Sequence, residues 1–236
     1  MRYSVQSVLR ALRSAGDPRN VEGMARFGIT SAKAYGVPAP FIHSLARKIG
    51  CDHKLAQRLW STGILEARGL AALIGDPAKV TVGMMNRWVK DFDNWAVCDG
   101  ACCNLFDKTP FAGAMALKWT RHNKEFIKRA GYVLMAALAV HDKTAPDENF
   151  LKFLPVIKRG STDERNFVRK AVNWALRQIG KRNLNLNVAA RKAALEIRSI
   201  GTSTARWIAS DALRELESPT VQRRLKQKAR TTLHAR

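Results

Sequence analysis

Apolar residues recur along the chain at intervals of three and four positions, the spacing that lines one face of an α-helix. The first example is formed by Val5, Val8, Leu9 and Leu12. The same spacing returns in stretches spread over the whole chain, at 41–46, 55–60, 80–89, 126–140, 150–157, 167–179 and 188–200. The strict alternation of apolar and polar residues that is typical of β-strands is missing. The pattern therefore predicts an all-α protein.

Proline and small polar residues divide these stretches into short elements. A capping residue directly before a proline favours the first turn of a helix, because the missing N–H of proline has no partner to lose there. Such pairs occur at Asp17-Pro18, Asp76-Pro77, Thr109-Pro110 and Ser218-Pro219. The segment 36–40 reads Gly-Val-Pro-Ala-Pro and predicts a rigid connector. We expect many short helices joined by short links.

One helical segment returns at a fixed distance. Phe-Ile-Lys-Arg-Ala at 126–130 is followed 41 residues later by Phe-Val-Arg-Lys-Ala at 167–171, and a further step of 41 reaches 208–212. Helix pairs that repeat every ~40–47 residues are typical of HEAT-type arrays. The sequence therefore predicts a HEAT-like helical repeat solenoid, an α-α superhelix with a concave face. We expect one domain over 1–236 that ends in a basic helix or tail at about 219–236.

The charge is the most unusual property of the composition. Lys and Arg number 41 and Asp and Glu number 19, so the formal net charge is +22. Such an excess indicates a polyanionic partner, either nucleic acid or an anionic membrane. The longest apolar run, 131–140, has about half of the ~20 residues that a membrane span needs. Arg10 and Arg13 lie where a secretory signal peptide would have its apolar segment. We expect a cytoplasmic protein that contacts DNA or RNA, and no membrane contact.

Basic residues recur in each of the later helix pairs. On one side of a solenoid they would form a stripe that follows phosphates and makes the concave face basic. The candidate DNA-binding residues are Lys128, Arg129, Arg169, Lys170, Lys181 and Arg182. The run from Arg223 to Arg230 adds a basic C-terminal segment.

Cysteine and glycine patterns exclude some other chemistries. Cys98, Cys102 and Cys103 lack the paired spacing of zinc ligands, so we expect core thiols and no metal site. Glycine-rich phosphate loops are absent, which leaves no simple nucleotide-binding motif. We expect no cofactor. Four tryptophans in apolar helical spacing are expected to pack in the core: Trp60, Trp88, Trp119 and Trp207.

The strongest candidate for chemistry is the segment 88–100. Trp95 and Asp99 are four positions apart, so on a helix their side chains share one face. Asp93 or Asn94 is placed to cap that helix. An indole face beside a carboxylate suits the stabilisation of a developing cation. The spacing alone favours a core tryptophan and a surface carboxylate, and only its context makes the pair specific.

Five segments in order resemble one known family, the AlkD-type DNA alkylation repair glycosylases. Tyr-Gly-Val-Pro-Ala-Pro at 35–40 is similar to the YGVPxP connector of that family, and the segments at 59–71 to its LW…ExR..A helix pair. Trp-Ala-Val-Cys-Asp at 95–99 resembles its catalytic WDxVD segment. The helices at 126–130 and 167–174 resemble its WxRRxA and FxxKAxxW helices. The resemblance covers roughly residues 20–215.

The resemblance implies a specific reaction and a specific site. Members of this family wrap duplex DNA with HEAT-like repeats and hydrolyse the N-glycosidic bond of N3- and N7-alkylated purines, without metal or cofactor. On that pattern Asp99 takes the position of the catalytic carboxylate, and Trp95 and Trp174 those of the aromatic residues that pack on the deoxyribose. Arg129 takes the position of an arginine that contacts the DNA backbone. A monomer and a monofunctional glycosylase in base excision repair are expected.

The sequence departs from the family pattern at Ala96, Cys98, Phe126 and Lys128. Relatives exist that keep the scaffold and lose excision. One alternative is therefore a non-catalytic HEAT-repeat binder of damaged or structured DNA. A second alternative is a protein-interaction solenoid, which would lack steeply salt-dependent duplex binding.

Overall fold

The structure is a computed structural model that describes residues 3–31 and 33–234, with side chains described up to residue 231. The described residues form α-helices and short 3-10 turns, and no β-strand occurs among them. The all-α prediction is confirmed. The chain divides into two compact units, the first ending at Phe111 and the second beginning at Ala112. The expectation of one continuous domain over 1–236 stays a prediction.

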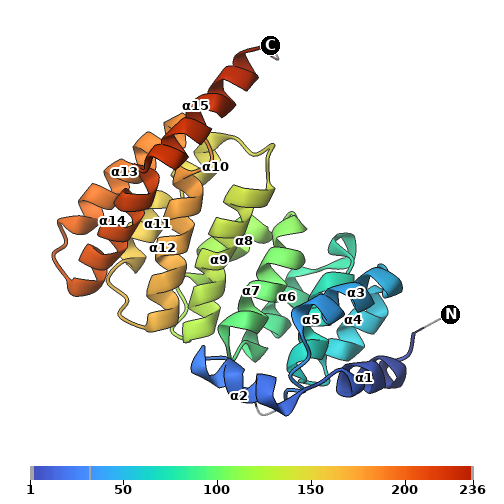
Figure 1. Cartoon of the computed structure of the whole chain (residues 1–236). Helices are drawn as coiled ribbons and strands as arrows, with labels where there is room; N and C mark the ends of the chain where they lie inside the picture. The colour runs from blue at the N-terminus through green and yellow to red at the C-terminus, as the bar shows by residue number, and fades with distance from the viewer. Residues whose placement is uncertain (1–2, 32, 235–236) are drawn as a thin grey trace. The chain divides into compact units, whose positions relative to one another are not determined.

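The helices of the first unit are short, as the capping pairs predict (Figure 1). They are α1 (Val5–Ser14), α2 (Pro18–Arg26), α3 (Ala39–Ile49), α4 (His53–Trp60), α5 (Leu65–Ile74), η1 (Pro77–Lys79), α6 (Val82–Trp88), η2 (Val89–Asp91), α7 (Trp95–Asn104) and η3 (Phe106–Lys108). Helix α5 lies at the centre and packs against α3, α4 and α7. Seven of its ten residues are buried, because a helix covered on several sides needs apolar residues around most of its circumference.

A buried carboxylate fixes the connector between α2 and α3. Glu66 on α5 is 3% exposed and accepts hydrogen bonds from the backbone N–H groups of Tyr35, Gly36 and Val37 at 2.7–3.3 Å. Gly36 has a φ of +74°, and a Cβ added there would lie 2.1 Å from the carbonyl oxygen of Asp17. Only glycine fits this close approach without strain. The connector is therefore rigid, as its sequence predicts.

Buried aromatic side chains form part of the core of the first unit. The rings of Trp60 and Trp88 stack in parallel, with centroids 3.9 Å apart. Both side chains are buried, and so is Trp119 in the second unit. The core prediction is confirmed for these three tryptophans. It is wrong for Trp207, which is 39% exposed.

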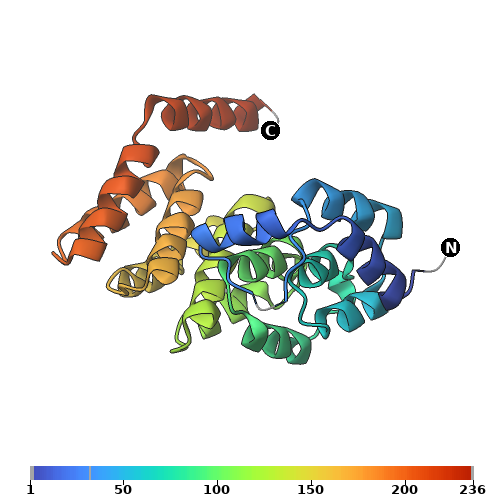
Figure 2. The same cartoon turned by 60° about the horizontal axis from the view of Figure 1, so that its bottom comes forward.

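The second unit consists of α8 (Ala112–Trp119), α9 (Glu125–His141), α10 (Asp147–Leu151), α11 (Leu154–Gly160), α12 (Asn166–Gly180), α13 (Leu184–Arg198), α14 (Ser203–Leu216) and α15 (Pro219–His234). Helices α9, α12 and α14 lie side by side in one row (Figures 1 and 2). A second layer backs this row, because α8 packs on α9, and α11 and α13 pack on α12. Two layers of helices of this kind are the arrangement expected for HEAT-like repeats.

The repeat predicted from the sequence is visible in this row. Helices α9 and α12 begin at Glu125 and Asn166, 41 residues apart, and their Phe126 and Phe167 rings lie 5.3 Å apart. Helix α14 begins at Ser203, only 37 residues after α12. The second step between helix starts is therefore shorter than the predicted 41 residues. Arg169 on α12 lies over the ring of Trp207 on α14.

Helix α15 packs against α13 and α14. Leu225 is 1% exposed, and Gln222 donates to the Asn187 side chain and to the Leu216 carbonyl oxygen. None of the described helices combines the length and the apolar content that crossing a membrane requires.

Candidate functional site

Helix α7 carries the predicted Trp95–Asp99 pair, and its start is fixed by a buried cap. Asn94 is fully buried, and its side-chain oxygen accepts a hydrogen bond from the Val97 N–H at 3.1 Å. Asparagine is among the best residues at this position, because its side chain satisfies an N–H that the helix leaves without a partner. Trp95 is therefore the first residue of the helix, and Asp99 follows one turn later.

The indole of Trp95 is held in one orientation. It is half-buried, and its Nε1–H donates to the carbonyl oxygen of Phe27 at 2.9 Å. Phe27 caps the C-terminal end of α2, so this bond joins the end of α2 to α7 within the first unit. Trp95 also lines an apolar cavity of 790 Å³ bounded by α2, α3, α5 and α7.

Asp99 is half-buried on α7 beside two buried thiols. Burial raises the pKa of the Cys102 thiol well above its ordinary value, and a hydrogen bond with Cys98 and the nearby charge of Asp99 add to this effect. Cys98 and Cys102 are buried as expected, Cys103 is half-buried and Cys51 is exposed. No group of three or more His, Cys, Asp or Glu residues in the described part of the chain is arranged to hold a metal ion.

The other two predicted site residues lie in the second unit. Arg129 on α9 is only 7% exposed, and its Nη1 donates to the carbonyl oxygen of Phe167 on α12 at 2.6 Å. Trp174 is half-buried on α12, about two turns after Phe167. The α9–α12 pair therefore carries both residues, whereas Trp95 and Asp99 belong to the first unit.

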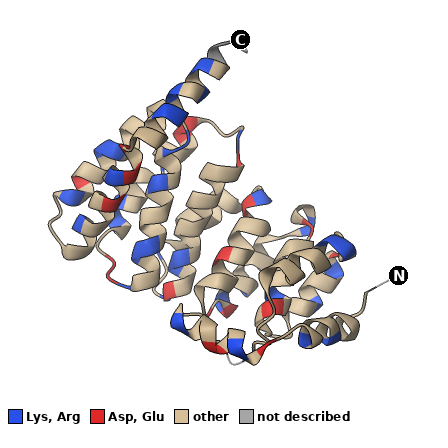
Figure 3. Cartoon of the chain, viewed as in Figure 1, with Lys and Arg blue, Asp and Glu red and all other residues tan. Residues whose placement is uncertain are grey.

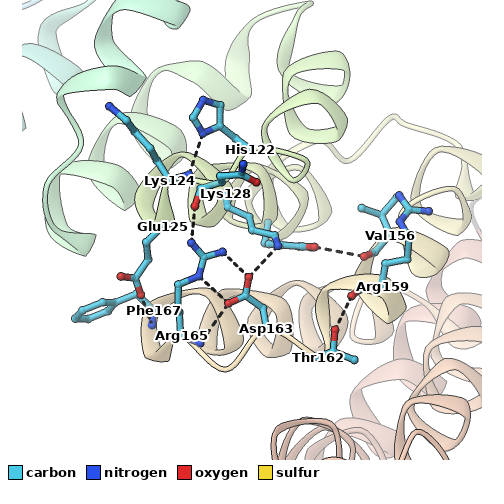
Figure 4. A network of polar contacts seen from close by, with 12 residues as sticks. His122, Lys124, Glu125, Lys128, Val156, Arg159, Thr162, Asp163, Arg165 and Phe167 are labelled. Atoms are coloured by element: carbon cyan, nitrogen blue, oxygen red, sulfur yellow. Dashed lines mark hydrogen bonds and ion pairs between the residues drawn. The ribbon is translucent and has the colours of Figure 1, made fainter.

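Lys128 belongs to a network that the sequence did not predict (Figure 4). Its Nζ lies 2.8 Å from Oδ2 of Asp163, and Arg165 pairs with the same carboxylate at 2.5 Å. Arg165 also donates to the carbonyl oxygen of Asn123 at 2.6 Å. Burial alone would raise the pKa of Asp163, but hydrogen bonds from Arg165 and Lys128 outweigh it and lower this pKa to about 2. The charge of Lys128 is therefore compensated within the protein.

Most of the other predicted DNA-binding cations also have partners within the second unit. Lys181 pairs with Glu215 at 2.5 Å. Arg169 lies over the exposed Trp207 ring, 5.2 Å from its centroid. Arg182 lies 4.3 Å from the centroid of the Phe150 ring and donates to two carbonyl oxygens. Lys170 differs, because it is exposed and no hydrogen bond or ion pair of its side chain occurs among the described residues.

Basic positions are spread over the helices of the second unit, and acidic positions lie next to several of them (Figure 3). Sequence reasoning missed these compensating carboxylates, Asp163 and Glu215. It also missed Lys143, which lies in the loop after α9 near the basic C-terminal helix. The basic run at 223–230 was the one signal that pointed to this region.

A model of the family described as DNA alkylation repair enzyme matches residues 8–216. The chain belongs to this family. The family predicted from the five sequence motifs is therefore confirmed.

One solved structure shows the fold of this family member. It is described as belonging to a new family of proteins related to the HEAT-like repeat DNA glycosylases, with affinity for branched DNA structures. It superposes with a TM-score of 0.75 at 19% identity, over 90% of this chain and 95% of that chain. The HEAT-like repeat fold is thereby confirmed. The comparison with curated proteins found no match.

A second structure is a designed armadillo repeat protein in complex with a (KR)4 peptide, with a TM-score of 0.38 and 14% identity over 80% of each chain. That score is too low to indicate a shared fold.

Proposed function

We propose that this DNA alkylation repair family member is a monofunctional DNA glycosylase that excises cationic N3- and N7-alkylated purines from duplex DNA. The observation that carries the proposal is the pair of Trp95 and Asp99 on α7, with the indole anchored to the Phe27 carbonyl and the carboxylate one helical turn away. This pair matches the motif that the family uses for catalysis, at the same spacing. Membership of the family supports the same conclusion.

The chemistry needs only what this pair supplies. An alkylated purine is already a cation, so it leaves with the electrons of the N-glycosidic bond without protonation. The difficulty lies at C1′ of the deoxyribose, where an oxocarbenium ion develops. The Asp99 carboxylate would stabilise that cation and orient a water that adds to C1′, with the water proton passing to Asp99 and then to solvent. The products are the neutral base and an abasic site. Positioned general-base help is typically worth ~10²–10⁴-fold in rate.

The family resemblance assigns further roles to two residues of the second unit. Trp174 would pack on the deoxyribose of the lesion. Arg129 would contact the phosphate next to the lesion through the small part of its side chain that is exposed, since the rest is buried and one guanidinium nitrogen donates to the Phe167 carbonyl. The net charge of +22 would attract the protein to the phosphates of DNA. The proposed protein acts as a monomer in the cytoplasm, in contact with the nucleoid.

The experiment is the release of free alkylpurine from methylated duplex DNA, with the wild type beside Asp99→Asn. We expect the variant to bind the duplex at least as well and to excise at least ~10²-fold more slowly, since it keeps the shape and loses the charge. Glu22→Gln is the matched control, because it removes one exposed carboxylate from the same unit. Excision by Asp99→Asn at the rate of the control would overturn the assignment.

A second candidate function is structure-specific DNA binding without excision. It is favoured by the solved structure with the similar fold, whose protein has affinity for branched DNA. Competition between a four-way junction and a linear duplex separates the two candidates. A strong preference for the junction, together with no base release by the wild type, would favour the second one. A protein-interaction solenoid would give neither base release nor salt-dependent binding.

A further inference from the structure

A basic cleft lies between α15 and the C-terminal ends of α9 and α12, and none of the four proposed catalytic-site residues lines it. Its volume is 870 Å³, which falls in the range of about 300–1,000 Å³ typical of small-molecule and cofactor sites. The walls come from the end of α9, the loop that follows it, the link between α12 and α13, and one side of α15.

Positive charge dominates these walls. Five basic side chains line the cleft: Lys143, Lys181, Arg182, Arg224 and Lys228. One carboxylate lines it, that of Asp147, and both of its oxygens accept hydrogen bonds from the amides of Asn183 and Asn185. Lys181 is paired with Glu215. Even with that pair counted as neutral, the walls keep an excess of positive charge.

The cations are close enough to repel one another. Burial lowers the pKa of Lys228, and the charges of Arg224, Lys143 and Arg182 lower it further. Like charges that are held together and partly removed from water destabilise their own charged forms. A bound anion would reduce this repulsion, so the charge of the cleft favours anion binding.

The cleft is also rigid. Arg182 donates to the carbonyl oxygens of Ala139 at 3.3 Å and Ala145 at 2.8 Å, and its guanidinium covers the Phe150 ring. Lys228 reaches the Arg182 carbonyl at 3.4 Å, and Leu225 anchors the same helix in the core. Groups held in place before binding lose little entropy when a ligand arrives.

We propose that this cleft binds the phosphodiester backbone of a nucleic acid, and that α15 thereby acts as a clamp on DNA. The inference rests on the DNA binding in the proposed function but not on excision. It assigns the basic C-terminal helix a contact of its own, made through Arg224 and Lys228. Three other basic residues of α15 are exposed and lie outside the cleft walls: Arg223, Lys226 and Arg230.

The test compares two double variants with the same change of charge. The cleft variant combines Arg224→Gln with Lys228→Gln and removes two positive charges from the cleft walls. The control variant combines Arg223→Gln with Lys226→Gln and removes two positive charges from α15 outside the cleft walls. Binding to an unmodified duplex is measured between 50 and 200 mM salt. Each lost phosphate contact lowers the log–log slope by about 0.9. We expect the cleft variant to lose about 1.8 from the slope and the control variant to lose much less.

A slope change of about 1.8 means that wild-type affinity falls about 12-fold more than that of the cleft variant over this fourfold change of salt. Equal losses in the two variants would overturn the proposal, because only the total charge would then matter. An unchanged slope in the cleft variant would overturn it as well. Circular dichroism and thermal unfolding of both variants check that α15 remains folded.

A second arm identifies the source of the phosphate groups. Inorganic phosphate is added to the wild type and the cleft variant, and thermal stability is measured. Stabilisation of the wild type by phosphate at low millimolar concentration without the slope change would assign the cleft to a free anion and refute the clamp. Because binding is measured on undamaged DNA, loss of the clamp and absence of glycosylase activity give different results.

Discussion

Replacing Asp163 by asparagine should destabilise the protein in a manner that depends on pH. The carboxylate accepts hydrogen bonds from Lys128 and Arg165, and its side chain is only 9% exposed. Its pKa is lowered from 3.8 to about 2. One pH unit of separation between folded and unfolded pKa corresponds to about 1.36 kcal/mol. The ionised carboxylate therefore contributes roughly 2–3 kcal/mol to folding at neutral pH.

The direction of the pH effect follows from the sign of the pKa change. A carboxylate whose folded pKa is depressed stabilises the protein above its unfolded pKa, here 3.8. The stabilisation is lost as pH falls toward the folded value of about 2. About half of it should remain at pH 3. The Asp163→Asn variant has no carboxylate to titrate at this position. The difference in free energy of unfolding between wild type and variant should therefore fall by about half between pH 7 and pH 3.

The assay is urea-induced unfolding at pH 7 and pH 3, followed by circular dichroism. Glu164→Gln is the control, because Glu164 is the exposed neighbouring carboxylate. We expect Asp163→Asn to lose roughly 2–3 kcal/mol at pH 7 and the control to stay within about 0.5 kcal/mol, as surface substitutions usually do. A variant no less stable than the control, or an equal loss at both pH values, would refute the reasoning.

Two further predictions test the charges and the connector. Lys170→Gln should lower the log–log slope of duplex affinity against salt concentration by about 0.9. Lys128→Gln should lower this slope less, because Asp163 already compensates the charge of Lys128. Equal effects of the two variants in binding titrations at several salt concentrations would contradict this prediction. Gly36→Ala should destabilise the first unit by about 1–3 kcal/mol, since alanine at a φ of +74° is strained and its Cβ would meet the Asp17 carbonyl. Thermal unfolding measures this loss, and Gly23→Ala, where a Cβ meets no atom within 4 Å, is the control.

Local patterns predicted the parts of the structure that depend on near neighbours in the chain. Apolar spacing of three and four identified the helices, and the step of 41 residues brought Phe126 and Phe167 into contact. Trp95 and Asp99 share a helix because their spacing is local and Asn94 caps that helix. The five family motifs identified the family, since their order along the chain is specific.

Contacts between helices could not be predicted in the same way. Asp163 neutralises Lys128 across 35 residues, and nothing in the sequence near either residue shows the pairing. Trp207 occupies an apolar helical position like Trp60, but it is 39% exposed and lies under Arg169. The cleft at α15 depends on how Lys143 and Arg182, in different segments, come to face the last helix. Such arrangements follow from packing geometry rather than from local periodicity.

The hydrogen bond from the Trp95 indole to the Phe27 carbonyl has a consequence for how this protein can evolve. It spans 68 residues of sequence, and its acceptor is a backbone atom that any residue at position 27 would supply. Substitutions along α2 can therefore shift the aromatic ring without altering α7 itself. Substitutions in α2 could therefore change substrate preference while the proposed catalytic carboxylate on α7 stays unchanged. A library for directed evolution belongs there, at residues 18–29, before any change is made at 95–99.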